Sequence, residues 1–344
     1  MKRVQSLDIL RGATVALMVL VNNPGSWAAV WAPLRHASWN GLLFADLVFP
    51  LFLFVMGVSM YFSLHRGGFK LSWKMLKRTL LLIGIGLIIN WISGIVWSHE
   101  WSLASLRYTG VLQRFGLCFG ICAVLVCTLP QRSLPWISAG ILGVYAAILL
   151  LGNGYVYGPE NVVARVDRLL VPEAHLYSDN GLDPEGLLST LPCLAHTLIG
   201  FLVGKLVYEK KAKETLLSGV ALLALGLLLA LWLPLNKKVW SPSFVLVLCG
   251  MGTLVLGLLY YLVDERGLWK HYGFFKAFGT NAIFCYVMGD VVAWVMDGSG
   301  LHRWYALNAV DGAPLLSFCY AVACVLLVWL SVLPLYKRKI FLKL

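Results

Sequence analysis

A histidine, an amide and a carboxylate that could take part in catalysis lie close together near the start of the chain. His36 and Asn40 precede a strongly apolar segment, and Asp46 lies inside it. Histidine changes protonation near neutral pH, and general-base help of this kind accelerates reactions by roughly 10²–10⁴-fold. A charge in hydrocarbon costs at least about 2.5 kcal/mol and usually has a function. We therefore expect chemistry here, with an interfacial histidine bonded to a loop carbonyl as the alternative.

The spacing leaves open how these side chains meet. Asn40 lies on the same face as His36 if the stretch is helical. In a continuous helix Asp46 would lie about 15 Å from His36 along the axis, too far for a direct bond. Either the chain breaks near Gly41, or Asp46 serves a neighbouring helix. Arg114 is a candidate partner for Asp46, and a structural ion pair between two helices is the alternative.

The composition indicates a membrane protein. Hydrophobic residues make up 60% of the 344 residues and charged residues 13%, whereas soluble domains average about 25% charged. We predict one all-α transmembrane domain over 1–344, a polytopic bundle of about ten helices near the roughly 20 residues that a span needs. The predicted spans are 7–24, 43–64, 75–97, 109–129, 134–152, 185–208, 215–234, 243–263, 274–296 and 314–336.

The distribution of basic residues predicts the orientation. About twenty Lys and Arg fall on one side and about eight on the other, which places both termini in the cytoplasm. His36 and the long loop at 153–184 then face outward. The net charge of +12 thus reflects topology, and we expect no nucleic-acid partner. We expect no cleaved signal peptide, because Asp8 and Arg11 interrupt the first apolar run.

Further polar residues are candidates for the walls of the site. Asn22-Asn23-Pro24-Gly25 ends the first span early, and unwound backbone at membrane depth is tolerated only where it lines a cavity or is buried in protein. Asn22 is therefore assigned to the outward-facing site, and Asn281 in the ninth span is a weaker candidate of the same kind. Asp290 in that span needs a partner for its carboxylate.

A basic group lies on the predicted inner side. Lys70, Lys74, Lys77 and Arg78 are joined by Arg11, which lies one or two turns inside the first helix. Such a group could bind a polyanionic ligand, and ordinary topology with lipid-headgroup contact is the alternative.

Two other patterns favour structural interpretations. Asp183, Pro184 and Glu185 have the N-cap, first-position and first-turn preferences of a helix start. Cys118 and Cys122 lie four residues apart, but no histidine or further cysteine completes a site nearby. We expect no metal, and we expect the eight cysteines to act as small apolar packing residues without a structural disulfide.

Nine short motifs in one order resemble the heparan-alpha-glucosaminide N-acetyltransferase family, within the transmembrane acyltransferases. They are Ser6-Leu-Asp8-Ile-Leu-Arg11-Gly12, His36-Ala-Ser-Trp-Asn40-Gly, Ala45-Asp46-Leu-Val-Phe-Pro50, Gly110-Val-Leu-Gln-Arg114, Asp167-Arg168-Leu-Leu, His175-Leu-Tyr177, Asp183-Pro-Glu-Gly186, Asn236-Lys-Lys-Val-Trp240-Ser and Arg338-Lys-Ile-Phe341.

The resemblance implies transfer of acetyl from cytosolic acetyl-CoA to the amine of a sugar, such as glucosamine, across a lipid bilayer. It implies that His36 is the active histidine, and Asn40, Asp46 and Arg114 match further family positions. We expect His36 to act as general base, with an acetyl-histidine intermediate as the alternative. We expect Asp46 to orient the imidazole or to hold the site open. Asn40, Asn22, Arg114 and Asn281 would serve the reacting carbonyl or the acceptor. We expect Arg11, Lys74 and Arg78 to hold the acetyl-CoA phosphates.

The short chain suggests a bacterial cytoplasmic membrane, and a homodimer is possible. A transporter or flippase for a small polar solute, with Asp46 and Asp290 as coupling groups, is the rival interpretation. The absence of an evident internal repeat weakens it. A third interpretation keeps the chemistry and changes the acceptor to a hydroxyl on an envelope glycan.

Overall fold

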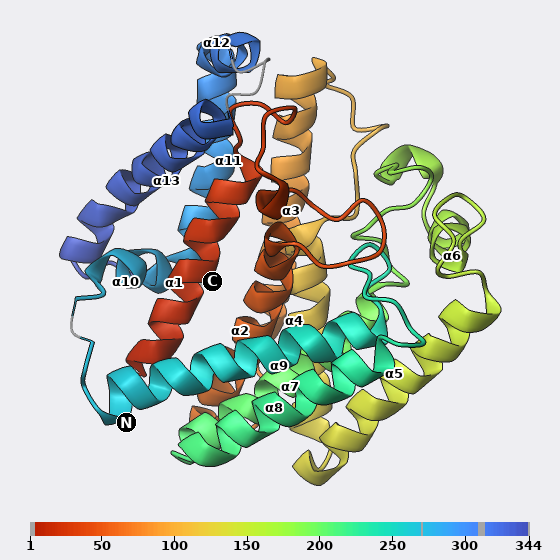
Figure 1. Cartoon of the computed structure of the whole chain (residues 1–344), viewed down its shortest axis with the longest axis vertical. Coiled ribbons are helices and arrows are strands. Elements are labelled where there is room, and N and C mark those ends of the chain that lie inside the picture. Colours follow the sequence, from red (N-terminus) through yellow and green to blue (C-terminus); the bar gives the residue numbers. More distant parts are fainter. Residues whose placement is uncertain (1–3, 270, 309–313, 343–344) are drawn as a thin grey trace. The chain divides into compact units, whose positions relative to one another are not determined.

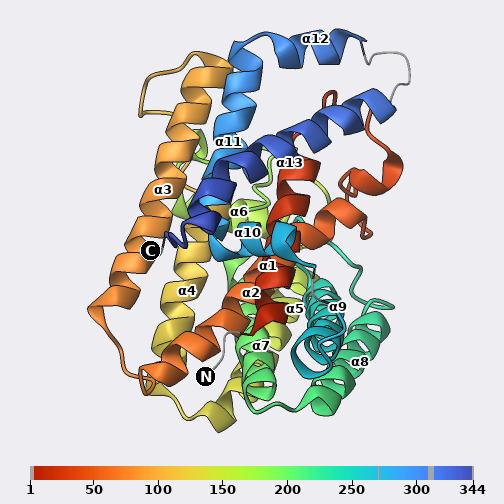
Figure 2. The same ribbon diagram turned by 90° about the vertical axis from the view of Figure 1, so that its left-hand side faces the viewer.

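The fold is helical, as predicted. The computed structural model describes residues 4–269, 271–308 and 314–342, and its helices are labelled in Figure 1 and turned by 90° in Figure 2. The α-helices are α1 (Gln5–Asn22), α2 (Phe44–Arg66), α3 (Trp73–Ser98), α4 (Val111–Thr128), α5 (Leu134–Leu151), α6 (Val162–Leu170), α7 (Thr190–Tyr208), α8 (Ala212–Leu229), α9 (Pro242–Leu259), α10 (Gly273–Thr280), α11 (Ala282–Gly298), α12 (Leu301–Asn308) and α13 (Pro314–Lys337). Short 3₁₀ turns occupy Ala32–Leu34 (η1), Gln131–Ser133 (η2) and Glu173–His175 (η3), and a π-helical stretch, η4, follows α9 at Tyr260–Glu265.

Eight of these helices are long and apolar enough to cross a membrane, judged by length and composition. They correspond to the second to eighth and the tenth predicted spans. The first predicted span is a helix, α1, but it falls outside this group, because Asp8 and Arg11 lower its hydropathy. The bent pair of α10 and α11 corresponds to the ninth predicted span and brings the total to nine in the described ranges. The cytoplasmic location of the termini remains a prediction.

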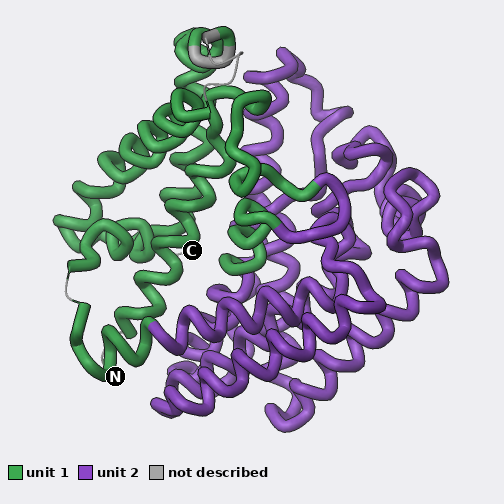
Figure 3. The backbone as a smooth tube through the Cα atoms, viewed as in Figure 1, with its two compact units in different colours: residues 1–37, 43–52, 259–343 green, residues 38–42, 53–258, 344 purple. Residues whose placement is uncertain are grey.

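The chain divides into two compact units (Figure 3). Unit 1 comprises residues 1–37, 43–52 and 259–343, and unit 2 comprises residues 38–42, 53–258 and 344. Helix α2 contributes to both, because its first part belongs to unit 1 and its remainder to unit 2. Each unit is described below by itself.

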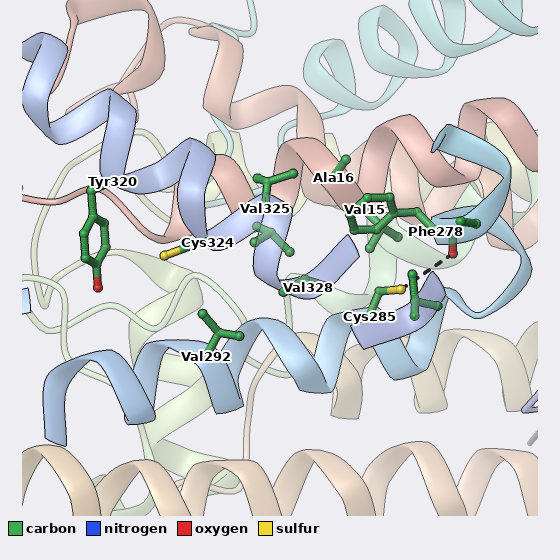
Figure 4. Packing of buried hydrophobic residues seen from close by; sticks show 12 residues of the cluster. Val15, Ala16, Phe278, Cys285, Val292, Tyr320, Cys324, Val325 and Val328 are labelled. Carbon is green, nitrogen blue, oxygen red and sulfur yellow. Dashed lines mark hydrogen bonds between the residues drawn. The ribbon is translucent and has the colours of Figure 1, made fainter. Parts of the chain in front are cut away.

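Unit 1 is built on the close packing of α1 against α10, which lies across it (Figure 1). Gly12 and Gly279 make this possible: a Cβ added to Gly12 would collide with the carbonyl of Phe275, and one added to Gly279 with the carbonyl of Asp8. The apolar core beside this crossing includes Val15, Phe278, Cys285 and Val328 (Figure 4).

The ninth predicted span, 274–296, is broken in the structure. Helices α10 and α11 meet at a bend of 92°, and Asn281 lies at the bend. Its side chain is 1% exposed. The Nδ2 group donates to the carbonyl of Ile340 at 3.0 Å, and Oδ1 accepts from the amide of Leu342 at 2.8 Å. The amide of Asn281 therefore ties the bend to the segment that follows α13.

Unit 2 contains two kinds of helix contact. Helices α3 and α4 lie side by side (Figure 2), and α7 packs against α4, α5 and α8. The second part of α2 approaches α7 closely at glycines, because a Cβ on Gly57 would meet the backbone of Thr197 and one on Gly200 the backbone of Phe54. Small residues at such crossings let helix backbones approach in membrane proteins.

Candidate active site

His36 and Asp46 lie together in unit 1. The Nδ1 atom of His36 is 2.8 Å from Oδ1 of Asp46. The Asp46 side chain is 1% exposed, whereas that of His36 is 40% exposed. The other carboxylate oxygen, Oδ2, accepts from the backbone amides of Ala37 at 3.0 Å and Leu43 at 3.1 Å. The buried carboxylate of Asp46 thus accepts several hydrogen bonds and holds the accessible imidazole of His36 in place.

The local fold explains how residues ten positions apart in sequence make this bond. The stretch is not one helix: α2 begins at Phe44, and the chain before it runs through bends and the short η1 turn. Gly41 adopts φ +118°, a conformation that side-chain-bearing residues rarely take. Of the two alternatives raised by the spacing, the break near Gly41 is confirmed.

The pair has the arrangement of an oriented general base. When the imidazole is neutral and Nδ1 donates its proton to Asp46, the lone pair resides on Nε2. A carboxylate that fixes the tautomer and stabilises the imidazolium is the usual companion of a catalytic histidine. The arrangement can accept a proton at Nε2 and return it.

Asn40 belongs to unit 2. Its Oδ1 accepts a hydrogen bond from Nδ2 of Asn236 at 3.0 Å, and the amide of the adjacent Gly41 donates to the carbonyl of Leu235 at 2.8 Å. Asn236 is fully buried, and its Oδ1 accepts from the amide of Val239. The loop around Asn40 is therefore fastened to the turn at 234–241. Since Oδ1 of Asn40 is the bonded atom, its Nδ2 group is the end that can donate to a substrate carbonyl.

Arg114, which belongs to unit 2, is buried at 1% exposure. Its Nη2 donates to the carbonyl of Gly186 at 2.8 Å and to Oγ of Ser189 at 2.5 Å. Its guanidinium also lies over the ring of Trp240, 5.4 Å from the centroid. These contacts join the start of α4 to the segment before α7, and the proposed ion pair with Asp46 stays a prediction.

The sequence reading missed a further polar cluster in unit 2, around Arg107. Its Nη2 lies 2.7 Å from Oδ1 of Asp183 and 2.8 Å from Oε2 of Glu185. Thr109 donates to Oδ2 of Asp183 at 2.5 Å, and Nδ2 of Asn90 donates to the carbonyls of residues 107 and 109. Burial lowers the pKa of Arg107, but Glu185 and Asp183 outweigh this and hold it above its ordinary value.

This cluster corrects the predicted helix start at Asp183-Pro184-Glu185. Helix α7 begins at Thr190, after Ser189 as the N-cap residue. The carboxylate of Asp183 is bonded to Arg107 and Thr109 and to the amides of Tyr177 and Glu185, so it closes a loop rather than capping a helix. The long loop predicted at 153–184 contains α6 and η3.

Asp167 on α6 lies against the same segment. It is 1% exposed, and its Oδ1 accepts from the amide of Leu188 at 2.9 Å. Gly186 lies so close that a Cβ there would collide with Oδ2 of Asp167. Burial raises the pKa of Asp167 from 3.8 to about 6.

The remaining candidates for substrate contact have different surroundings. Asn22 is exposed where α1 ends, as the sequence predicted, while the neighbouring Asn23 is buried and donates to the carbonyl of Val19 at 2.8 Å. The amide of Asn281 is bonded to backbone, as described above. Asp290 lies on α11 in unit 1 and is partly exposed.

The basic candidates for phosphate binding belong to different units. Arg11, in unit 1, donates from Nη1 to the carbonyl of Gly279 at 3.2 Å and lies 3.6 Å from Oδ1 of Asp8. Lys74 and Arg78 lie on α3 in unit 2. Lys74 is exposed, and the guanidinium of Arg78 lies 4.5 Å from the ring centroid of Phe119.

Comparison with protein families decides where the chain belongs. Residues 3–231 match the family model described as heparan-alpha-glucosaminide N-acetyltransferase, catalytic. The chain is a member of this family. The matched region contains His36, Asn40, Asp46 and Arg114.

Two curated relatives are similar over most of the chain. Heparan-alpha-glucosaminide N-acetyltransferase of Homo sapiens is 31% identical over 415 aligned residues, and the enzyme of that name from Mus musculus is 31% identical over 414. Each alignment covers 99% of this chain and 60% of the relative. The family member described here thus spans about three fifths of the length of the curated relatives.

Proposed function

We propose that the protein is a membrane acetyltransferase that moves acetyl from acetyl-CoA to the amine of an amino sugar such as glucosamine. The observation that carries the proposal is the His36–Asp46 pair in a chain of this family. The relatives are named for an N-acetyltransfer to a glucosaminide, and the pair provides a general base that such a transfer can use. The donor is supplied from the cytosol and the acceptor lies on the other side of a bacterial cytoplasmic membrane. The homodimer stays a prediction.

The chemistry is a direct transfer with His36 as general base. The amine nitrogen attacks the thioester carbonyl carbon, and its proton passes to Nε2 of His36. The C–S bond then breaks, and the departing thiolate takes that proton to leave as the free thiol of CoA. Asp46 stabilises the imidazolium between these steps. Asn40 donates from Nδ2 to the carbonyl oxygen as negative charge develops on it.

The test is transfer from labelled acetyl-CoA by the purified protein in proteoliposomes. We expect label on glucosamine and none on N-acetylglucosamine, whose nitrogen is already acylated. Label on N-acetylglucosamine would instead indicate transfer to a hydroxyl. No labelled acceptor, together with uptake of a solute into the vesicles, would favour the transporter interpretation and overturn the proposal.

His36→Ala is the first variant to measure. Loss of the base lowers kcat by roughly 10²–10⁴-fold. The melting temperature is measured beside kcat, because the variant leaves the buried carboxylate of Asp46 without its His36 partner and should lower stability. The binding of CoA should change little. Turnover equal to the parent would remove His36 from the mechanism.

Donor binding is tested separately through the basic residues. Arg11→Ala, Lys74→Ala and Arg78→Ala should raise the KM for acetyl-CoA and leave the KM for glucosamine unchanged, because they would contact phosphates. A variant with an unchanged KM for acetyl-CoA identifies a residue that only neutralises lipid headgroups or supports the fold.

A further inference from the structure

A small cavity in unit 1 lies beside the segment that carries His36. Its volume is about 20 Å³, and it lies between the last turn of α1, the segment 24–34 and the start of α13. Pro24, two residues after α1 ends at Asn22, is one of its lining residues. The early end of α1 therefore contributes a wall of this cavity.

The cavity and the His36–Asp46 pair have neighbouring residues in common. Val21 and Leu34 both line the cavity. Val21 also forms an apolar cluster with Ala45, and Leu34 packs against that cluster. Leu34 precedes His36 by two residues, and Ala45 directly precedes Asp46. Each member of the pair is therefore within two residues of a side chain that lines the cavity or packs against its wall.

Hydrogen bonds to α13 hold the walls of the cavity together. The amide of Gly25 donates to the carbonyl of Ser317 at 3.2 Å. The hydroxyl of Ser317 accepts from the amide of Ser26 at 3.0 Å and donates to the carbonyl of Ser26 at 3.2 Å. The rings of Trp31 and Phe318 lie 4.9 Å apart between centroids. The two segments that face each other across the cavity are thus fastened to one another, which fixes its size.

The cavity suits one small apolar group. None of its lining residues, all within the described ranges, carries a charge. The hydroxyl of Ser317 is engaged with Ser26 both as donor and as acceptor. A buried water molecule needs about 10–15 Å³ and two to four polar partners, so the cavity has room for a group of that size but lacks the partners. A methyl group needs none.

The acetyl group of the proposed donor presents such a methyl group. Its methyl carbon is one bond away from the carbonyl carbon that the amine attacks, so a pocket for the methyl group has to lie beside the base. Longer acyl groups carry the same thioester but add at least one carbon. Because packed walls do not accept extra methylenes without strain, a cavity of this size admits acetyl and crowds the longer groups.

We propose that this cavity holds the methyl group of the acetyl donor and restricts transfer to short acyl groups. The inference rests on the proposed function and adds to it the residues that select the acyl chain. Phe318, against Trp31, forms the bulky wall that limits the length of the chain. Ala321, which is 3% exposed, keeps space for the methyl group through its small side chain.

The first test compares acetyl-CoA with propionyl-CoA, with glucosamine as the acceptor. In the parent, kcat/KM for propionyl-CoA should be at least about tenfold lower, as expected for one methylene in a fitted pocket. Phe318→Ala enlarges the cavity and should raise the propionyl-to-acetyl ratio of kcat/KM about tenfold. Phe284→Ala is the matched control, because Phe284 is another partly buried phenylalanine of unit 1 outside the cavity lining. It should keep the ratio of the parent.

The second test fills the cavity. Ala321→Val adds two methyl groups at its wall, so kcat/KM for acetyl-CoA should fall about tenfold, the effect of about one methyl-sized group in a pocket. Ala323→Val is the control, since Ala323 lies two residues further along α13 at an exposed position, and it should match the parent. Unchanged kinetics in Ala321→Val would mean that the cavity takes another apolar group, such as the end of a lipid chain, and would overturn the proposal.

The remaining results also decide the question. Equal kcat/KM for the two donors in the parent, or an unchanged ratio in Phe318→Ala, would overturn the acyl pocket and leave the acetyltransferase proposal standing. If Phe318→Ala does not fold, Phe318→Leu replaces it and should raise the ratio less steeply. If the parent transfers no acetyl, the proposed function fails, and melting temperatures with acetyl-CoA or propionyl-CoA decide the pocket alone. Greater stabilisation by acetyl-CoA supports the pocket, whereas equal stabilisation, or none, overturns it.

Discussion

Nδ2 of Asn236 donates to Oδ1 of Asn40 at 3.0 Å, across 196 residues of chain. The bond fixes which end of the Asn40 amide faces protein and which end remains as a donor. Asn236 is itself held by the amide of Val239 and by the backbone of Ser241. The loop that carries Asn40 is therefore held in one orientation against the turn at 234–241.

Asn40→Asp separates the two uses of this side chain. A carboxylate oxygen still accepts from Asn236, so the fold is kept, but the donor to the substrate carbonyl is lost. We expect kcat to fall by about 10²-fold, in the range found when one oxyanion donor is removed, with a melting temperature near that of the parent. A kcat within threefold of the parent would exclude Asn40 from the carbonyl site.

Asp46→Asn tests the orientation of His36. The new amide can accept from Ala37 and Leu43 through its oxygen, which leaves its NH₂ group facing Nδ1. His36 must then carry its proton on Nε2, where it cannot act as a base. Initial rates with saturating acetyl-CoA should fall by roughly 10²–10⁴-fold, without loss of folded protein by size-exclusion chromatography. Retained activity would mean that Asp46 is only structural.

Arg107→Ala should destabilise the protein strongly. It leaves the fully buried carboxylate of Asp183 without its charged partner, and breaking a buried pair costs about 3–5 kcal/mol. The exposed pair of Arg165 and Glu160 provides the control, because Arg165→Ala should cost less than about 1 kcal/mol. Thermal unfolding in detergent measures both. Equal, small losses of stability in Arg107→Ala and Arg165→Ala would show that the buried cluster around Arg107 does not stabilise the fold.

Asp167 predicts a particular dependence of stability on pH. The carboxyl group of Asp167 loses its proton near pH 3.8 in the unfolded chain, whereas in the folded protein its pKa is about 6. The folded state thus binds more protons between these values, so the stability contributed by Asp167 is complete below pH 3.8 and is lost as pH rises through about 6. The full effect is about 3 kcal/mol.

The measurement compares melting temperatures from pH 4.5 to 7.5. Relative to Asp167→Asn, which does not titrate, the parent should lose stability as pH rises. Glu160→Gln is the control: it removes an exposed carboxyl group of the segment at 153–184 and should show the same pH profile as the parent. Parallel curves for the parent and Asp167→Asn would contradict the raised pKa.

Gly12→Ala tests the crossing of α1 and α10. The added methyl group would collide with the carbonyl of Phe275, and backbone cannot move aside as a side-chain tip can. We expect a loss of several kcal/mol or failure to fold, by analogy with overpacked cores that lose about 1–3 kcal/mol. Gly84→Ala is the control, because no atom lies within 4 Å of its added Cβ. If Gly12→Ala is as stable as Gly84→Ala, then α1 and α10 do not pack closely at Gly12.

The helices themselves were largely predictable, because apolar runs of about 20 residues carry a strong signal. The break at Asn281 was not, since α10 and α11 form one apolar run and the bend depends on bonds to residues 340 and 342. The start of α7 was placed too early because Asp183 resembles an N-cap residue. Its actual partner, Arg107, lies 76 residues away, and local sequence patterns carry no information about such pairs.

In the candidate site, too, residue types could be predicted from the sequence and long-range contacts could not. His36 and Asp46 were identified by residue type. Helix geometry then left two alternatives: a chain break near Gly41 that lets the two side chains meet, or a role for Asp46 on a neighbouring helix. The sequence could not choose between them, since both satisfied the spacing. The sequence suggested a helix start for Asp183 and Glu185 and gave no role to Arg107. Their convergence on a single guanidinium depends on the folding of two long loops.

The interleaving of the two units limits how the protein can be made in pieces. Unit 1 draws on three separate stretches, 1–37, 43–52 and 259–343, so no single truncation isolates it. A fragment that ends at Leu258 would contain nearly all of unit 2 and only the N-terminal portion of unit 1, including His36 and Asp46 but neither α10 nor α13. Split-gene expression at this point should therefore give catalysis only when both fragments are produced together in one cell.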